Sequence, residues 1–316
     1  MVIAATGGPA ELTMADVPVP TRINAEVLVK VVAASVNPID AKTRAGGGTA
    51  AEIPSYPAIL GRDFSGVVVE TPYEACVIKP GDEVFGIVPV PRVPGAYAEF
   101  ITVPLMSIAR KPPRLSHTEA AAVPLAALTA WGMVVDVAKA HEGQTVLVHA
   151  GAGGVGHFAV QFAAYFGAHV IATGSQGNAS FLRELGAAEV IDYATTRFEE
   201  LLSGVDVVVD LIGNVHDETG TRSLKVLRPG GLIINVPSGS WPTLLADAAE
   251  AGVRATTYKV SDDGSTLAVI ARLLDSGDVR VHVDQVFDLD HVGDAHRAIE
   301  TGHTRGKLVV TVSDLV

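Results

Sequence analysis

Cysteine is almost absent from this sequence of 316 residues, which contains only Cys76. A single cysteine cannot form a disulfide within the chain, and it cannot supply the several thiolates of structural zinc sites or iron–sulfur clusters. We therefore expect an intracellular protein without a cysteine-rich metal centre.

Basic residues and long hydrophobic runs are also scarce. Lys and Arg number 23 against 35 Asp and Glu, for a net charge of −12, and no Lys/Arg-rich stretch provides a basic face for phosphates. No basic residue precedes Arg22, unlike the start of a signal peptide. The longest apolar-rich stretch, 120–135, is broken by Pro124, Thr129 and Gly132, and it is shorter than the roughly 20 residues that span a bilayer. We expect a cytoplasmic protein with no nucleic-acid partner and no membrane helix.

The residues that are abundant predict two structural regimes. From residue 23 to about 102, short β-rich runs at 27–32, 66–70 and 83–87 are separated by Pro and Gly, which is typical of a β-dominated module. Prolines then crowd the stretch 89–113 and become rare. Beyond it, apolar strand runs alternate with helical patterns, which indicates a parallel α/β sheet. We expect its strands at 145–149, 169–172, 189–191, 206–211, 231–236 and 253–258.

The last sixty residues return to a mixed pattern. They predict a helix over 265–276, a short strand near Val286, a helix over 289–301 and a final strand over 307–312. Strand and helix therefore continue to the end of the chain.

A glycine-rich turn follows the first strand of the α/β region. The segment 146–156 (VLVHAGAGGVG) contains G-x-G-x-x-G at Gly151, Gly153 and Gly156 and leads into a helix with one apolar face that ends before Gly167. Glycine permits the tight turn, the approach of a pyrophosphate to the backbone and the packing of helix on strand. The helix N-terminus attracts the phosphates, so we predict dinucleotide binding by residues 151–156, Ala152, Gly154 and Val155 included.

The second strand favours NADPH over NADH. An NAD site usually has an acidic residue about 20 positions after the turn, to bind the ribose 2′-hydroxyl. Here the segment 170–180 has no acid, and Ser175, Asn178 and Arg183 suit a 2′-phosphate instead. These residues can also simply cap the next helix.

Several segments together give the chain a resemblance to a known family. They are 35–40 (SVNPID), 61–66 (GRDFSG), 79–84 (KPGDEV), 95–100 (GAYAEF), 128–131 (LTAW), 186–193 (GAAEVIDY), 227–231 (LRPGG), 306–310 (GKLVV) and the glycine turn. In this order they resemble the medium-chain dehydrogenase/reductase superfamily, in its zinc-free branch of quinone oxidoreductases and enone or enoyl reductases. The resemblance implies an α/β protein in which a Rossmann doubly wound parallel sheet, residues 118–260, is inserted in a β-rich GroES-like catalytic domain, residues 1–117 plus 261–316.

The resemblance also bears on metal. Zinc-dependent relatives have a catalytic cysteine where this chain has Asn37 and a histidine where it has Arg62, so we expect no metal site. The ten histidines do not replace these ligands. His291, His296 and His303 are spaced by five and seven residues, and we expect them to be solvated surface side chains.

Without a metal, the substrate must already be electrophilic, as quinones and α,β-unsaturated carbonyls are. Asn37 is expected to donate a hydrogen bond to the ribose or the substrate oxygen, or else to be a turn residue before Pro38. Thr129 is implied to lie beside the nicotinamide, or to pack a helix between domains. Asp40 binds substrate or caps a turn, and Asp63 is expected to be structural. The resemblance adds further cofactor contacts at Tyr193, Ile212, Val236, Ser238 and Lys307.

One feature departs from the family pattern. Several relatives use a tyrosine shortly after the Asn-Pro element to hold or protonate substrate, whereas this chain has 44–49 (RAGGGT), and Tyr56 comes late. The small residues at 45–51 leave room for a bulky substrate. The alternatives are an NADPH-binding structural or regulatory protein with little catalysis, and a metal-free alcohol or aldehyde dehydrogenase. A homodimer is expected through the strand at 253–258, whose edge would otherwise be exposed.

Overall fold

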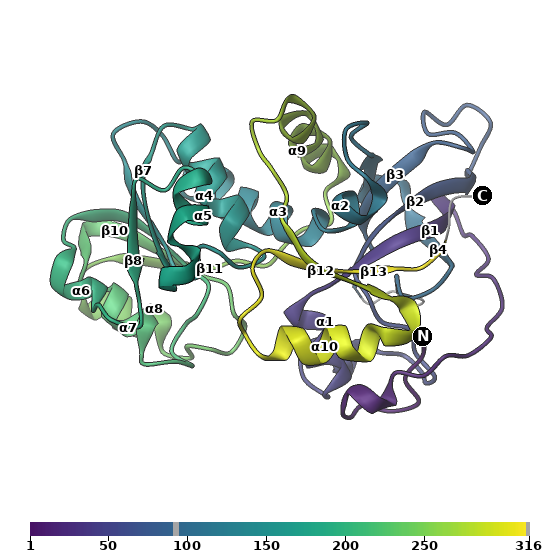
Figure 1. The fold of residues 1–316 in the computed structure, drawn as a ribbon, viewed down its shortest axis with the longest axis horizontal. Helices are drawn as coiled ribbons and strands as arrows, with labels where there is room; N and C mark the ends of the chain where they lie inside the picture. Colours follow the sequence, from purple (N-terminus) through teal and green to yellow (C-terminus); the bar gives the residue numbers. More distant parts are fainter. Residues whose placement is uncertain (91–94, 314–316) are drawn as a thin grey trace. The chain divides into compact units, whose positions relative to one another are not determined.

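The structure is a computed structural model that describes residues 1–90 and 95–313, and it divides into two compact units. One unit comprises Met1–Leu128 and Asp262–Val316, and the other comprises Thr129–Ser261 (Figure 1). The first unit extends past the expected boundary at residue 117, because helix α2 (His117–Ala121) packs against strands β1 and β2 of its sheet. The expected boundary at residue 260 lies next to the observed join.

The unit of residues 1–128 and 262–316 is built on a mostly antiparallel sheet. Its strand order is β12-β13-β1-β2-β3-β5, with β4 paired to β1. The strands are β1 (Glu26–Val36), β2 (Asp63–Glu70), β3 (Glu83–Ile87), β4 (Phe100–Pro104), β5 (Ile108–Arg110), β12 (Val283–Asp288) and β13 (Lys307–Thr311). The helices are α1 (Pro38–Arg44), α2, α9 (Gly264–Ser276) and α10 (Val292–Glu300). The C-terminal strands predicted near Val286 and over 307–312 therefore join the N-terminal β module.

The register of β1 assembles polar residues from three distant segments. Ser35 of β1 lies opposite Asp63 of β2, and Val36 lies opposite Leu308 of β13. Residue Asn37, which follows β1, is therefore held between the first residues of β2 and β13.

Both faces of β1 are covered, and this explains why nine of its eleven residues are buried. One side contributes to a core with residues such as Phe64, Ile101 and Leu308. On the other, Ala33 packs with Ala121 of α2.

The unit 129–261 has a six-stranded parallel sheet in the order β11-β10-β9-β6-β7-β8. Its strands are β6 (Thr145–Val148), β7 (His169–Gly174), β8 (Glu189–Asp192), β9 (Val205–Asp210), β10 (Leu227–Asn235) and β11 (Arg254–Thr257). All six predicted strands are confirmed, with small shifts at their ends. Counted from β6 as the first strand, the order is 3-2-1-4-5-6, which is that of a Rossmann fold. The topological switch point lies between β6 and β9.

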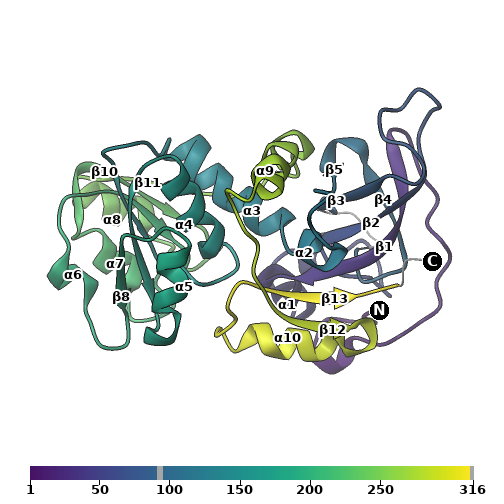
Figure 2. The ribbon, with the colours of Figure 1, turned by 45° about the horizontal axis from the view of Figure 1, so that its top comes forward.

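Helices cover both faces of this sheet, as Figures 1 and 2 show for α4 and α5 on one side and α7 and α8 on the other. Their bounds are α4 (Gly156–Tyr165), α5 (Ala179–Glu184), α6 (Phe198–Leu201), α7 (Thr219–Ser223) and α8 (Leu244–Glu250). Helix α3 (Pro124–Trp131) crosses the join between the units and continues as a π-helix over Gly132–Val137. The central strands are buried on both faces, which matches their unbroken valine runs.

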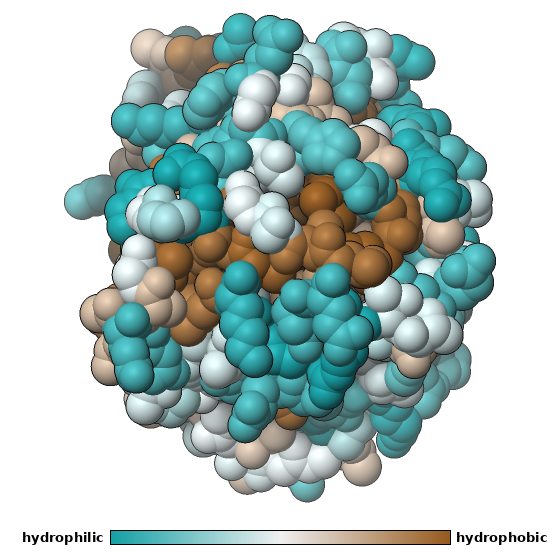
Figure 3. Space-filling model, turned by 90° about the vertical axis from the view of Figure 1, so that its left-hand side faces the viewer, coloured by the Kyte–Doolittle hydropathy of each residue, from teal (hydrophilic) through white to brown (hydrophobic). Residues whose placement is uncertain are grey.

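The surface of the unit 129–261 carries a band of hydrophobic residues on the face seen in Figure 3. Most of the rest of this face is polar. Within residues 1–90 and 95–313, no helix is both long enough and apolar enough to cross a membrane.

Candidate active site

The predicted glycine turn lies at the switch point of the parallel sheet. It connects β6 to α4, and Ala150 before it adopts a left-handed backbone with φ 49°. A Cβ on Gly156 would lie 2.2 Å from the carbonyl oxygen of Ala150, and one on Gly151 would lie 3.0 Å from Ala172 Cβ. The glycines are therefore needed because backbone and β7 approach the turn closely, as a phosphate-binding turn requires.

The other predicted cofactor residues gather at the same edge of the sheet. Ser175 follows β7, Tyr193 follows β8, Ile212 follows β9, and Val236 and Ser238 follow β10. Because the strands are parallel, their carboxyl ends share one edge with the turn, where ligands of open α/β sheets bind. Arg183 lies apart from these ends, exposed on α5, and Thr129 lies buried in α3.

Ser175 and Asn178 contact each other and do not cap a helix with their side chains. Asn178 Nδ2 donates to Ser175 Oγ over 3.2 Å, and neither side chain caps the helix that it precedes. The capping alternative is therefore wrong for these two side chains. Both are half-buried at the edge where a ribose phosphate is expected.

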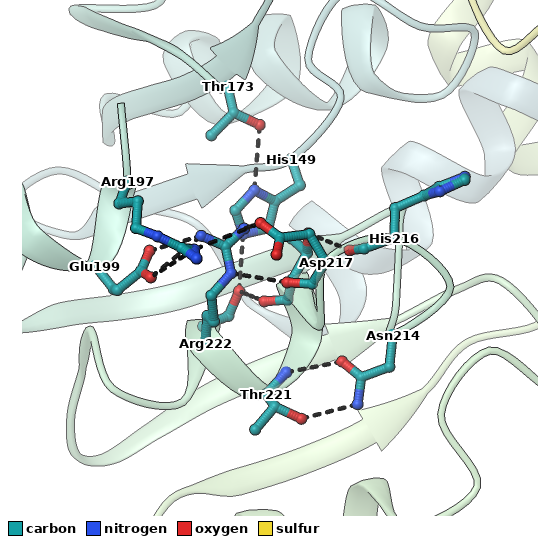
Figure 4. Close-up of polar contacts among 11 residues, drawn as sticks. His149, Thr173, Arg197, Glu199, Asn214, His216, Asp217, Thr221 and Arg222 are labelled. Carbon is teal, nitrogen blue, oxygen red and sulfur yellow. Dashed lines mark hydrogen bonds and ion pairs between the residues drawn. The ribbon is translucent and has the colours of Figure 1, made fainter. Parts of the chain in front are cut away.

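A buried histidine that the sequence analysis did not single out holds the start of the turn (Figure 4). Ser223 Oγ donates to the carbonyl oxygen of Thr219, so it must accept from His149 Nε2 over 2.8 Å. His149 Nδ1 then accepts from Thr173 Oγ1, which in turn accepts the backbone N–H of Ala150. This directed chain fixes Ala150 and ties the turn to β7 and α7.

The environment of His149 keeps its ring neutral. Burial lowers the pKa of His149, although the nearby Asp210 opposes the shift. The centroids of the His149 and Phe198 rings lie 4.7 Å apart, and the Arg222 guanidinium lies 4.8 Å from the centroid of the Phe198 ring. Arg222 is itself paired with Glu199. A neutral imidazole has one donor and one acceptor nitrogen, which is the pattern that the chain requires.

In the other unit, Asp63 is the centre of a buried polar cluster. Its Oδ2 accepts from Ser35 Oγ and from Asn37 Nδ2, each over 2.9 Å, and its Oδ1 accepts from the backbone N–H of Leu125 over 2.8 Å. Asp63 has no exposed surface. The structural role expected for Asp63 agrees with these contacts.

Lys307 completes this cluster from β13. Its ammonium donates to Asn37 Oδ1 and to the carbonyl oxygen of Val36, and it lies 3.5 Å from Asp63 Oδ2. Burial lowers the pKa of Lys307, and the adjacent Asp63 and Asp40 carboxylates oppose the shift. These contacts use all three donor directions of the ammonium, so they assign Lys307 to positioning the Asn37 amide.

The Asp40 carboxyl lies at the start of helix α1 and also lines a pocket. Its Oδ2 accepts the backbone N–H of Asn37 over 2.8 Å, which satisfies a donor at the start of α1. It also lines a pocket of about 40 Å³ with Thr43, Thr49 and Arg62. Burial raises the pKa of the Asp40 carboxyl to about 7, against the opposing effects of the Asn37 N–H and Arg62. The prediction that Asp40 caps a turn is confirmed by its bond to the Asn37 N–H. Because Asp40 also lines the pocket, a role in binding substrate stays a prediction.

Ionisation of Asp40 should make the stability of the protein depend on pH. The folded-state pKa lies above the unfolded value, so between pH 4 and 7 the folded state binds more protons and stability falls as the pH rises. Asp40→Asn removes this cost, which reaches roughly 4 kcal/mol at full ionisation. We expect the variant to melt above the wild type at pH 8.5 and to lose that advantage at pH 5. Melting curves at both pH values test this, and an equal difference at both would contradict it.

The side chains at the zinc positions of zinc-dependent relatives do not fit zinc. Both polar ends of Asn37 are engaged with Asp63 and Lys307, and Arg62 is a cation. Zinc prefers thiolate, imidazole and carboxylate ligands. In residues 1–90 and 95–313, the ligand atoms of Asp288, Asp290 and His291 converge, and all three residues are exposed.

The expectation that His296 is a solvated surface residue is wrong. It has no exposed surface, and its Nε2 lies 3.1 Å from the hydroxyl of Tyr97. The helical pattern was right, but α10 turns this residue toward the core beside Ala295 and Val292. His291 and His303 are exposed as expected.

Two protein families match this chain, over different ranges of residues. The alcohol dehydrogenase GroES-like domain family matches residues 24–113, and the zinc-binding dehydrogenase family matches residues 185–310. A Rossmann unit inserted in a GroES-like unit defines a dehydrogenase/reductase class of protein.

Whole-chain relatives agree with this class. The human NAD(P)H oxidoreductase RTN4IP1, mitochondrial, is 35% identical over 324 residues, covering 91% of this chain and 82% of that protein. The NADPH-dependent alkenal/one oxidoreductase, chloroplastic, of Arabidopsis thaliana is 35% identical, covering 90% and 72%. The structure of the quinone oxidoreductase from Coxiella burnetii superimposes with a TM-score of 0.93 at 36% identity, covering 99% and 98%. The chain belongs to the medium-chain dehydrogenase/reductase superfamily, in its quinone oxidoreductase-like branch.

Proposed function

We propose that this protein is a zinc-independent oxidoreductase that uses NADPH to reduce a quinone or an α,β-unsaturated carbonyl compound. The observation that carries the proposal is the glycine turn at the switch point, with the predicted cofactor residues on the same sheet edge. Relatives named as an NADPH-dependent alkenal/one oxidoreductase and a quinone oxidoreductase support the cofactor and the substrate class.

The chain's own residues fit this cofactor. The turn and the N-terminus of α4 would hold the pyrophosphate, because a side chain on Gly156 would collide with backbone. Ser175 and Asn178 would hold the 2′-phosphate, at a strand end that lacks the carboxylate of an NAD site. Arg183, exposed on α5 and apart from this strand end, would reach the phosphate only with the end of its side chain. Bound NADPH supplies a hydride to the electrophilic carbon of the substrate. Thr129 and Asn37 remain our proposed contacts of the nicotinamide half.

The residues around Asn37 would stabilise charge on the substrate oxygen. Asn37 Nδ2 has two hydrogens, and Asp63 takes one of them. The other can donate to the ribose or to the oxygen that becomes negative after hydride transfer. Lys307 and Asp63 hold the amide in one orientation, so no reorganisation is needed during the reaction.

A substrate panel followed by the absorbance of NADPH tests this function. We expect consumption of NADPH with enones and quinones, faster for polycyclic ones such as phenanthrenequinone than for methyl vinyl ketone, because residues 45–51 are small. Tight NADPH binding without turnover would favour the binding-protein alternative. Alcohol-dependent reduction of NADP would favour the metal-free alcohol dehydrogenase.

We also propose a homodimer joined along β11. Among the strands that the structure describes, β11 pairs only with β10, so its other edge is open to a second copy. The hydrophobic band in Figure 3 lies on the same unit, and such bands mark interfaces. The cytoplasm remains our proposed location, and the names of two relatives place those proteins in mitochondria and chloroplasts.

A further inference from the structure

A chain of buried polar side chains leads away from Asp40. The hydroxyl of Tyr97 lies within hydrogen-bonding reach of the Asp40 carboxyl, and it lies 3.1 Å from His296 Nε2. Tyr97 and His296 have no exposed surface, and Asp40 has 3%. Asp40 lies on α1, Tyr97 in the segment before β4, and His296 on α10, so three separate parts of the unit contribute to one line of buried polar side chains.

The far end of this line approaches the surface. Arg44, buried in α1, pairs with Glu300 of α10, whose side chain is 42% exposed. Within the described residues, Nε and Nη1 of Arg44 and Nδ1 of His296 are buried without a hydrogen-bond partner. Arg44 is close enough to His296 to help lower the pKa of its ring. An ordered water can bridge buried groups of this kind, because it can accept from Arg44 and donate to His296 Nδ1.

The near end of the line opens into the pocket lined by Asp40, Thr43, Thr49 and Arg62. Its volume of about 40 Å³ exceeds what one water needs and is far below that of a substrate. An acid facing such a pocket can deliver a proton directly or through one water.

We propose that Asp40 supplies the proton consumed with the hydride, and that Tyr97 and His296 return a proton to it from the side of Glu300. This inference rests on the proposed function, and it answers the loss of the tyrosine that relatives use. Asp40 is the proton donor, and Tyr97 and His296 are positioning residues that act through it.

The step balances in atoms and charge. Hydride adds to the β-carbon of the enone, and the electron pair moves to the carbonyl oxygen. The O–H bond of the Asp40 carboxyl breaks as its proton passes to the α-carbon of this enolate, where the electron pair forms the new C–H bond, leaving a saturated ketone and a carboxylate. The carboxylate then takes the Tyr97 hydroxyl proton, Tyr97 takes the proton of His296 Nε2, and His296 Nδ1 takes one from solvent through the Arg44–Glu300 side. Exchange of the Nδ1 proton with water then restores the tautomer with the proton on Nε2 before the next turnover.

The protonation states of the three groups suit these roles. Burial raises the pKa of Asp40 to about 7, so the acid is present at neutral pH. Burial raises the pKa of Tyr97, and burial lowers that of His296 to about 3, so both pass protons as neutral groups. The other charged or titratable groups that face Asp40 are Arg62 and Asp63 of the β2 region and Lys307 of β13.

The decisive experiment separates the first turnover from the following ones. Wild-type protein with NADPH and an enone should lose activity with one ionisation near pH 7. Asp40→Asn should lower both the first and the steady-state turnover at least 100-fold and remove that pH dependence. Tyr97→Phe and His296→Gln should keep the first turnover within about 2-fold and lower the steady-state rate at least 10-fold, because only reprotonation is slowed. Tyr73→Phe, at an exposed tyrosine, is the matched control and should change neither rate.

Equal slowing of both phases by Tyr97→Phe, or an unchanged pH profile in Asp40→Asn, would overturn the relay. A second measurement is independent of turnover: the infrared band of a protonated carboxyl should disappear near pH 7 in the wild type and be absent from Asp40→Asn. No such band at pH 6 would overturn the inference even if the enzyme is active. If the band is present but no enone or quinone consumes NADPH, the proposed function fails and with it the use of this acid in catalysis.

Discussion

Replacing Gly156 with alanine should weaken NADPH binding at least 100-fold. The new Cβ would lie 2.2 Å from the carbonyl oxygen of Ala150, and a backbone atom cannot swing aside as the end of a side chain can. Either α4 or the turn must shift, and both provide the N–H groups that face the phosphates. Titration calorimetry with NADPH measures the loss, and circular dichroism checks that the variant is folded.

Two other glycines make this prediction specific. A Cβ on Gly153 would lie 3.3 Å from the same oxygen, so Gly153→Ala should weaken binding by a smaller factor. Gly8 has nothing within 4 Å and an ordinary backbone, so Gly8→Ala is the control for glycine replacement itself. Wild-type affinity in Gly156→Ala would show that the turn does not hold the pyrophosphate.

The parallel sheet was predictable because its signals are local. Each strand is a short apolar run, and Gly167 ends α4 with φ 83° as the helix pattern indicates. The glycine motif also lies within one strand, one turn and one helix. Because carboxyl ends of parallel strands share an edge, the strand assignments place Ser175, Tyr193 and Val236 together, while their contact with the cofactor stays a prediction.

The clusters around Asp63 and His149 were not predictable in the same way. Ser35, Asp63 and Lys307 are far apart in sequence and meet only through the register of β1 with β2 and β13. The burial of His296 depends on which face of α10 packs inward. Nothing in the local sequence distinguishes such a histidine from an exposed one, so non-local pairing decides these parts of the site.

Removal of the Asp63 carboxylate should cost more stability than any other single change discussed above. Asp63→Ala leaves the Lys307 ammonium buried with the neutral Asn37 amide and the Val36 carbonyl, and it removes the acceptor of the Ser35 hydroxyl and the Leu125 N–H. Breaking a buried ion pair by removing one partner costs about 3–5 kcal/mol. For a unit of this size we expect the melting temperature to fall by about 10 °C.

The double variant Asp63→Asn with Lys307→Met distinguishes a lost interaction from an unpaired charge. Asparagine keeps one of the two acceptor oxygens of Asp63, and methionine fills the space of the lysine without a charge. If the cost comes from the buried ammonium, the double variant should recover most of the stability that Asp63→Ala loses. The control is Asp290→Ala, at an exposed carboxylate, which should leave the melting temperature unchanged. Recovered stability with weakened turnover would then separate the two parts of this cluster: folding needs only that no charge is left unpaired, while catalysis needs the Lys307 ammonium to orient the Asn37 amide. A double variant as unstable as Asp63→Ala would instead place the cost in the hydrogen bonds to Ser35 and Leu125.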